Sequence, residues 1–98
     1  MRSSRLESGF QDRIIDILKK RFPGCMTFKL DRQGVPDLLI LFKNKWATLE
    51  CKRYETAHRQ PNQEYYVNLM NEMSFSRFIF PENRDFVLSE LDGFFYGD

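Results

Sequence analysis

Two short segments of the chain carry acidic and basic residues of the types that a metal-dependent hydrolytic site requires. One segment places Asp37 after Pro36, and the other places Glu50 and Lys52 on either side of Cys51. Two carboxylates brought together in an apolar setting repel each other, so one must take up a proton unless a cation lies between them. A hard divalent ion accepts such oxygen ligands, and Mg²⁺ is the usual ion at phosphate sites. We therefore expect Mg²⁺, or Mn²⁺ in its place, bound by Asp37, Glu50 and the backbone carbonyl of Cys51.

Phosphodiester hydrolysis is the reaction that this combination suits. A bound divalent ion neutralises phosphate charge and lowers the pKa of a bound water. Lys52, beside the carboxylates in the sequence, is then expected to orient or deprotonate the attacking water, or to stabilise the developing negative charge. The sequence leaves both roles of Lys52 open.

The hydrophobic pattern predicts the elements that must position these side chains. Apolar residues at helical or strand spacing predict helices over 4–22, 61–73 and 84–95, and strands over 26–30, 36–42, 46–52 and 76–80. The order α-β-β-β-α-β-α is typical of an α/β fold with a central mixed sheet flanked by helices. The apolar residues assigned to the last two helices are Tyr65, Tyr66, Leu69, Met70 and Met73 in one, and Phe86, Val87, Leu91, Phe94 and Phe95 in the other.

The two central strands decide whether the charged residues meet. The continuous apolar run 38–42 indicates a strand buried on both faces. A hairpin joins it to strand 46–52, in which Glu50 and Lys52 point to the same face. The hairpin joining the strands lets Asp37 and Glu50 approach each other across the pair. The alternative interpretation of Glu50 and Lys52 is a salt-bridged pair on the solvent face of an edge strand.

Composition sets the broad class of the protein. A length of 98 residues predicts one domain, covering residues 1–98. The net charge of +1 is lower than in most DNA-binding domains, although carboxylates at a metal site would offset basic residues. Aromatic residues reach 15%, which predicts a dense aromatic core or an apolar surface hidden by association. The chain shows no signal segment and no apolar run of membrane-spanning length, so we expect a cytoplasmic protein that does not enter a membrane.

A family resemblance rests on the two motifs. Residues 34–37 (Gly-Val-Pro-Asp) and 49–52 (Leu-Glu-Cys-Lys) resemble the signature of the PD-(D/E)XK nucleases. More narrowly, the chain resembles the virus-type replication-repair nuclease (VRR-NUC) domain, especially its small stand-alone phage members, from about Glu7 to Leu91. The resemblance implies a restriction-endonuclease-like core and a Mg²⁺-dependent endodeoxyribonuclease, placed in the host cytoplasm for a phage protein.

The resemblance also implies roles for individual residues. Asp37 and Glu50 match the metal ligands, and Lys52 matches the catalytic lysine. Glu7 matches an acidic position that completes the metal site in related nucleases, although it is also interpretable as a solvated helix residue. Gln63 matches a glutamine that faces the active site from the start of a helix; an ordinary surface amide is the alternative.

Basic and aromatic residues near the motifs are candidates for contacts with DNA. Arg53 and Arg59 lie in the loop after Lys52 and form the predicted phosphate-contacting surface. His58, the single histidine, either contacts phosphate or is simply exposed. Tyr65 and Tyr66 either stack on bases or pack against the protein.

The expected substrate is branched DNA, because stand-alone members of the resembled family are thought to act as Holliday junction resolvases. Symmetric cutting of a four-way junction requires two active sites, which a twofold homodimer supplies. The Phe-rich segments 74–80 and 84–95 are candidate dimer surfaces, with packing in the core as the alternative. The rival functions are a nickase or flap nuclease within a replication or repair assembly, and a non-catalytic nucleic-acid-binding module.

Overall fold

Three helices and four strands follow one another in the order α-β-β-β-α-β-α. The computed structural model describes the backbone of residues 5–97 and the side chains of residues 8–97. The elements are α1 (Arg5–Arg21), β1 (Met26–Lys29), β2 (Leu38–Phe42), β3 (Lys45–Cys51), α2 (Pro61–Met73), β4 (Ser76–Ile79) and α3 (Arg84–Tyr96). The predicted order is confirmed, and each boundary lies within two residues of its predicted place. Within residues 5–97, no helix combines the length and apolar character needed to cross a membrane.

The strands form one mixed sheet in the order β1-β2-β3-β4. β1 pairs with β2 and β2 with β3 in antiparallel fashion, whereas β4 lies parallel to β3. The β2–β3 hairpin is tight, because Phe42 pairs with Lys45 across the two residues of the turn. The parallel pair requires a crossover, which α2 provides. β3 is therefore an interior strand with a neighbour on each side.

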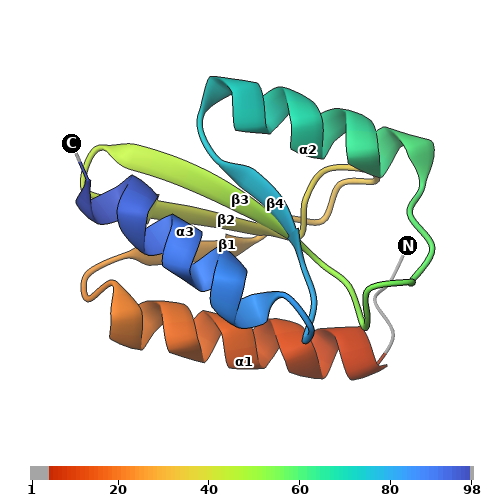
Figure 1. Cartoon of the computed structure of the whole chain (residues 1–98), viewed down its shortest axis with the longest axis horizontal. Helices are drawn as coiled ribbons and strands as arrows, with labels where there is room; N and C mark the ends of the chain where they lie inside the picture. Colours follow the sequence, from red (N-terminus) through yellow and green to blue (C-terminus); the bar gives the residue numbers. More distant parts are fainter. Residues whose placement is uncertain (1–4, 98) are drawn as a thin grey trace.

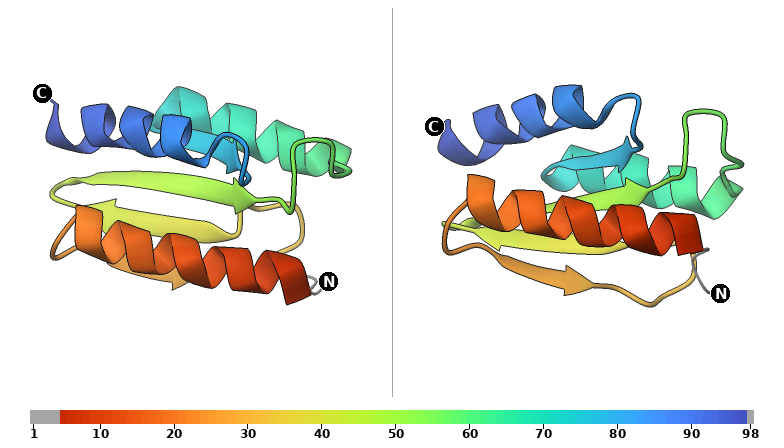
Figure 2. Two further views of the ribbon diagram at one scale, coloured as in Figure 1. Left: turned by 60° about the horizontal axis from the view of Figure 1, so that its bottom comes forward. Right: turned by 90° about the horizontal axis from the view of Figure 1, so that it is seen from below.

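The helices cover the two faces of the sheet unequally. α1 and α3 lie on one face, and α2 lies on the other (Figures 1 and 2). The core lies between the sheet and the α1–α3 layer, and its fully buried members include Ile14, Phe22, Leu38, Ile40, Leu49, Ile79, Leu91 and Phe95. The phenylalanines Phe10, Phe75 and Phe80 are also buried, whereas Phe28, Phe86 and three of the tyrosines are exposed.

The ends of α1 and α3 are joined by a polar and aromatic contact. Arg21 donates two hydrogen bonds to the carboxylate of Asp92, of 2.8 and 2.7 Å. These bonds raise the pKa of the Arg21 guanidinium above its ordinary value. The Tyr96 hydroxyl donates to the carbonyl of Arg21 at 2.7 Å, and the ring of Phe22 packs edge-on against Phe95. The bidentate pair of Arg21 and Asp92 thus joins the end of α1 to the last turns of α3.

The prediction that strand 38–42 is buried on both faces was wrong. Leu38 and Ile40 are fully buried on the α1–α3 side, but Leu39 and Leu41 are only half-buried on the other side. The reason is that α2, on this second side of the sheet, contacts β3 and β4 and does not extend over β1 and β2.

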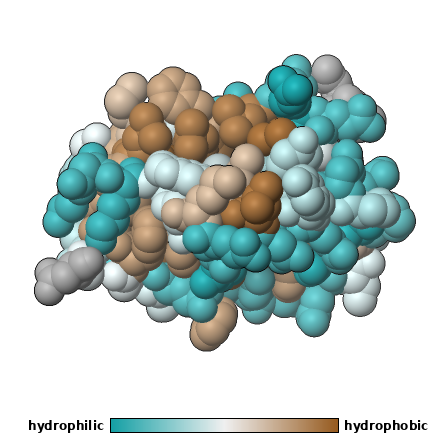
Figure 3. Space-filling view, turned by 90° about the horizontal axis from the view of Figure 1, so that it is seen from above, coloured by the Kyte–Doolittle hydropathy of each residue, from teal (hydrophilic) through white to brown (hydrophobic). Residues whose placement is uncertain are grey.

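An apolar surface results from this unequal cover. Register places Phe28 beside Leu39, and Met26 beside Leu41, on the face that α2 leaves open. Met26 and Phe28 are 54% and 42% exposed. We call these four residues the uncovered sheet face. Figure 3, which looks onto the α2 side of the molecule, shows apolar residues gathered beside a polar region.

Two helical faces also differ from prediction. Phe86, assigned to the buried side of the last helix, is 67% exposed, while Leu88 is buried in its place. In α2 the buried residue is Val67, and Tyr65 and Met73 are exposed. A helix turns about 100° per residue. A predicted apolar stripe that is shifted by one residue from the buried stripe therefore contains residues that face solvent.

A glycine shapes the turn that leads to Asp37. Gly34 has a φ of +86°, a conformation that residues with a Cβ rarely adopt. A Cβ at this position would lie 2.5 Å from Nδ2 and 2.9 Å from Cγ of Asn62, in the first turn of α2. The turn before β2 therefore packs directly against the start of α2.

We predict that Gly34→Ala lowers the free energy of unfolding by more than Gly24→Ala. Both glycines have positive φ, but nothing lies within 4 Å of a Cβ at Gly24. Left-handed backbone costs each alanine about 1–2 kcal/mol, and the contact with Asn62 adds to that cost only at Gly34. Urea unfolding of both variants measures the difference, and equal losses would show that the turn does not pack on α2.

Candidate active site

The predicted site residues converge at the end of β3. Glu50 belongs to β3, and Gln63 lies in the first turn of α2. Asp37 directly precedes Leu38, whose partner on β3 is Leu49, so Asp37 lies opposite Glu50 one step beyond the paired region. The hairpin prediction that brought these two carboxylates to one place is therefore confirmed by the register.

Asp37 is held by the backbone of β3. The N–H of Lys52 donates to the carbonyl of Ile79 on β4, so the preceding N–H, that of Cys51, points to the β2 side. There the carboxylate oxygen Oδ2 of Asp37 accepts the hydrogen bond from Cys51 at 2.9 Å. The carboxylate of Asp37 thus accepts the hydrogen bond that a backbone carbonyl of β2 would accept if the strand pairing continued. This bond to the sheet fixes the orientation of the carboxylate.

Glu50 is a buried carboxylate with a defined environment. Only 5% of its side chain is exposed, a placement that is costly for a charge unless polar groups compensate. Gln63 donates from Nε2 to Oε2 of Glu50 at 3.1 Å. The ammonium nitrogen of Lys52 lies 3.9 Å from the same oxygen.

Lys52 is also buried, with 8% of its side chain exposed. Its Nζ donates to Oε1 of Gln63 at 2.9 Å and to the carbonyl of His58 at 3.0 Å. The same Oε1 accepts a hydrogen bond from the backbone N–H of Gln60 at 3.0 Å. Gln63 therefore bridges the acid and the base, with its amide on Glu50 and its carbonyl on Lys52. We call these three residues the Glu50–Gln63–Lys52 network.

The edge-strand interpretation of Glu50 and Lys52 is wrong. β3 has hydrogen-bonded neighbours on both sides, and both side chains are buried. The predicted alternation is confirmed: Thr48, on the same face, bonds through Oγ1 to Ser76 of β4 at 2.7 Å, whereas Leu49 and Cys51 enter the core on the opposite face. Thr48, Glu50 and Lys52 therefore form a buried polar row on one face of β3, and α2 partly covers this row.

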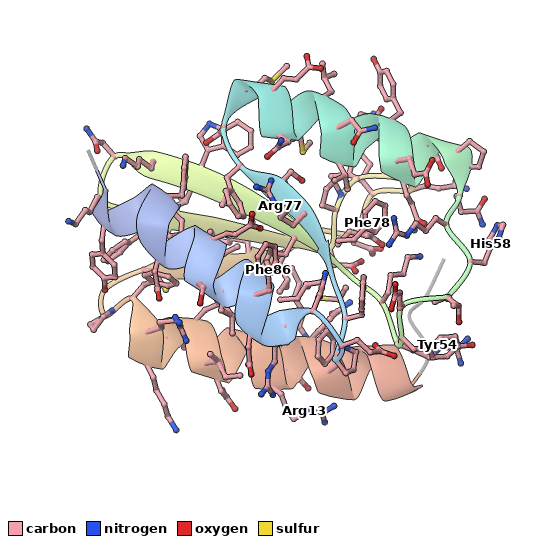
Figure 4. The ribbon with its side chains drawn as sticks, in the orientation of Figure 1. Arg13, Tyr54, His58, Arg77, Phe78 and Phe86 are labelled. Carbon is pink, nitrogen blue, oxygen red and sulfur yellow. The ribbon has the colours of Figure 1, made fainter. Side chains whose placement is uncertain are left out.

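The remaining predicted site residues have different environments. The side chains of Arg53 and His58 are exposed, and Figure 4 shows His58 at the periphery of the molecule, pointing outward. Arg59 is half-buried and its guanidinium lies over the ring of Phe78. Glu7 lies on α1, but its side chain is outside the described residues.

The donor set fits a hard divalent cation. Asp37 and Glu50 contribute carboxylate oxygens from adjacent strands, and oxygen donors are the ligands that Mg²⁺ and Mn²⁺ prefer. Among the side chains of residues 8–97, no group of three or more His, Cys, Asp or Glu gathers that could hold a metal ion, so the donor set at this place consists of two carboxylates. The residues that would hold such an ion are therefore Asp37 and Glu50.

One site residue was missed by sequence reasoning. Phe78 of β4 is the register partner of Glu50, so its ring shares the face of the Glu50–Gln63–Lys52 network. Its position depends on how β4 aligns with β3 across a long crossover. Nothing in the local sequence of β4 distinguishes it from the other phenylalanines.

A structural comparison bears on this arrangement. A solved structure described as a VRR_NUC domain superposes with a TM-score of 0.57 and 24% sequence identity, covering 79% of this chain and 85% of that chain. The chain has the fold of a VRR_NUC domain. The α-β-β-β-α-β-α core with its mixed sheet is accordingly restriction-endonuclease-like, as the motifs indicated. No protein-family model and no curated protein matches the sequence.

We predict that Gln63→Ala lowers the free energy of unfolding by about 1–3 kcal/mol, because the buried Glu50 and Lys52 side chains then lose hydrogen-bond partners. Glu64→Ala, the exposed neighbour on the same helix turn, is the control and should change stability by less than about 0.5 kcal/mol. Chemical denaturation measures both. Equal small effects would mean that the Glu50–Gln63–Lys52 network does not hold α2 to the sheet.

Proposed function

We propose that this chain, acting as one catalytic domain, is a Mg²⁺-dependent DNA endonuclease. The observation that carries the proposal is the buried Glu50–Gln63–Lys52 network with Asp37 held one step away on the neighbouring strand. A carboxylate and an ammonium group are costly to bury, and burial of such a pair contributes little to stability. Their placement is explained by chemistry on a charged substrate. The VRR_NUC fold supports a nuclease in particular.

Asp37 and Glu50 are the proposed ligands of the ion. The backbone carbonyl of Cys51 is a further proposed ligand, because in a strand the N–H and C=O of one residue point to the same side, and the N–H of Cys51 points to Asp37. When bound, the ion supplies neutralisation of phosphate charge and a lowered pKa of water. The hydrogen bond from Cys51 orients Asp37 for this task.

Lys52 is the proposed stabiliser of negative charge at the phosphate. An ammonium group has three N–H donors, and in Lys52 two of them point to Gln63 and to the carbonyl of His58. One donor remains for a phosphate oxygen or a water molecule. Gln63 is itself held by the N–H of Gln60. Together with the carbonyl of His58 it fixes two N–H groups of Lys52, and this sets the direction of the third.

Branched DNA is the proposed substrate, cut by a homodimer. In the segments 74–80 and 84–95, Phe75, Phe80 and Phe95 are buried in the core, whereas Phe86 is exposed on the α3 side. The uncovered sheet face supplies a better surface, since its apolar residues lie on the side of the sheet from which Glu50 and Lys52 also project. A second copy of this chain is the proposed partner there, which would place both active sites beside the interface.

We predict that the protein cuts a synthetic four-way junction in the presence of Mg²⁺, that EDTA abolishes cutting, and that Lys52→Ala reduces the rate by at least about 100-fold, the size of effect seen when one charge-stabilising donor is removed. Gel assays with junction and linear duplex of the same sequence measure this. Lys20→Ala, which removes an exposed charge from the last turn of α1, is the control.

The outcomes separate the rival functions. Equal cutting of junction and duplex would contradict the preference for branched DNA and favour a nickase or flap nuclease. Binding of DNA without cutting by the wild-type protein would contradict catalysis and favour a non-catalytic binding module.

We predict that light scattering reports about twice the chain mass of 11.8 kDa at micromolar concentration, and that Phe28→Glu returns the protein to a monomer. A charge in the uncovered sheet face cannot be buried without cost when two copies meet. Phe86→Glu places the same change at an exposed phenylalanine on the α3 side and should leave the dimer intact. A monomeric wild-type protein, or a dimer that survives Phe28→Glu, would contradict this assignment.

A further inference from the structure

The side chain of Arg59 is held in place by an aromatic ring beside the candidate site. Its guanidinium carbon lies 4.0 Å from the centroid of Phe78, the shortest such contact among the described residues. Phe78 is the β4 partner of Glu50 and projects from the same face of the sheet. Neighbouring strands of a sheet lie about 4.8 Å apart, so register partners are close neighbours on one face. Arg59 is therefore stacked on the ring that neighbours the buried carboxylate on the sheet.

The backbone around Arg59 is fixed on both sides. The carbonyl of the preceding residue, His58, accepts a hydrogen bond from Lys52 at 3.0 Å. The N–H of the following residue, Gln60, donates to Gln63 at 3.0 Å. Both contacts are with members of the Glu50–Gln63–Lys52 network. Arg59 is thus positioned by its neighbours in the chain as well as by the ring.

A second arginine–phenylalanine pair shows what a structural stack looks like in this protein. Arg77 lies 4.2 Å from the centroid of Phe75, and its guanidinium is also engaged by Glu90 at 3.0 Å and by the carbonyl of Ser76 at 2.9 Å. Within residues 8–97, Arg59 donates no comparable hydrogen bond and forms no ion pair. Its stack fixes the plane of the guanidinium and leaves the N–H donors at the edge of that plane.

We propose that Phe78 is a positioning residue that presents Arg59 to a backbone phosphate of the bound nucleic acid, next to the phosphodiester held at the Asp37–Glu50 site. The proposal rests on the proposed function and adds to it a contact between Arg59 and the phosphate backbone of the substrate. Arginine bonds a phosphate through two parallel N–H donors in one plane, so a ring that fixes the plane prepares the group for that contact. Packing on the ring also restricts the rotamers of Arg59 before binding, so less side-chain entropy is lost when the phosphate binds.

The test measures binding and cutting separately. Fluorescence anisotropy with a labelled four-way junction in EDTA follows binding without metal, at several salt concentrations. Arg59→Ala should weaken binding about 10-fold, as expected for one charged hydrogen-bonded contact. It should also reduce the slope of log affinity against log salt by about 1, because one phosphate contact is lost. In Mg²⁺, KM should rise while kcat is unchanged, since the contact is with a neighbouring phosphate.

Variants of the ring distinguish positioning from packing. Phe78→Leu should weaken binding in the same direction as Arg59→Ala, whereas Phe78→Tyr, which keeps an aromatic face, should bind like the wild type. In the Arg59→Ala background, Phe78→Leu should add no further loss. Lys20→Ala is the control for removal of one positive charge and should leave the affinity unchanged.

Three results would overturn the proposal. The first is an unchanged salt slope in Arg59→Ala, and the second is a wild-type protein that binds no DNA. The third is a loss of DNA affinity from Phe78→Leu that is as large in the Arg59→Ala background as in the wild-type protein. The failure of the endonuclease itself looks different. A wild-type protein that binds through Arg59 but does not cut in Mg²⁺ would remove the catalytic role and leave the phosphate contact standing.

Discussion

Burial of two opposite charges on one interior strand is the constraint on which the site depends. Glu50 and Lys52 project from the same face of β3 and are almost completely removed from solvent. Neither charge is tolerated there without polar partners, and an ion pair of 3.9 Å alone does not supply them. Gln63 meets the need of both, because an amide carries a donor and an acceptor on one carbon. The first turn of α2 is therefore tied to the end of β3 by the chemistry of the strand.

The opposite face of the sheet supplies the rigidity that this arrangement requires. Leu49 and Cys51 alternate with Glu50 and enter the core beneath α1 and α3, so the polar row cannot shift without displacing core residues. The parallel β3–β4 pairing adds Phe78 at the side of Glu50, and the crossover that the pairing demands carries Arg59 and Gln63 past the site. One topological feature thus brings an aromatic ring, an amide bridge and a positioned guanidinium to the strand end that carries Glu50.

Much of this arrangement follows from local sequence, and the exceptions have physical causes. The period of two in β3 fixed the faces of Glu50 and Lys52, and the hairpin fixed the approach of Asp37, since both are set by residues close in the chain. The half-open face of β2 was not predictable, because its burial depends on how far α2 reaches across the sheet. The exposure of Phe86 was missed because two apolar stripes one residue apart are equally compatible with the sequence. The Arg59–Phe78 stack depends on a register set across a long connection.

The proposed active site requires that Asp37 and Glu50 share a divalent cation, and calorimetric titration of the protein with Mn²⁺ measures this directly. We expect the wild-type protein to bind the ion, and Asp37→Asn to weaken binding at least about 10-fold, the lower end of the effect expected when a partner of a metal site is altered. Asp16→Asn, at an exposed carboxylate of α1, should bind like the wild type. An unchanged affinity in Asp37→Asn would contradict the shared metal site, because the carboxylate that Cys51 orients would then have no part in holding the metal.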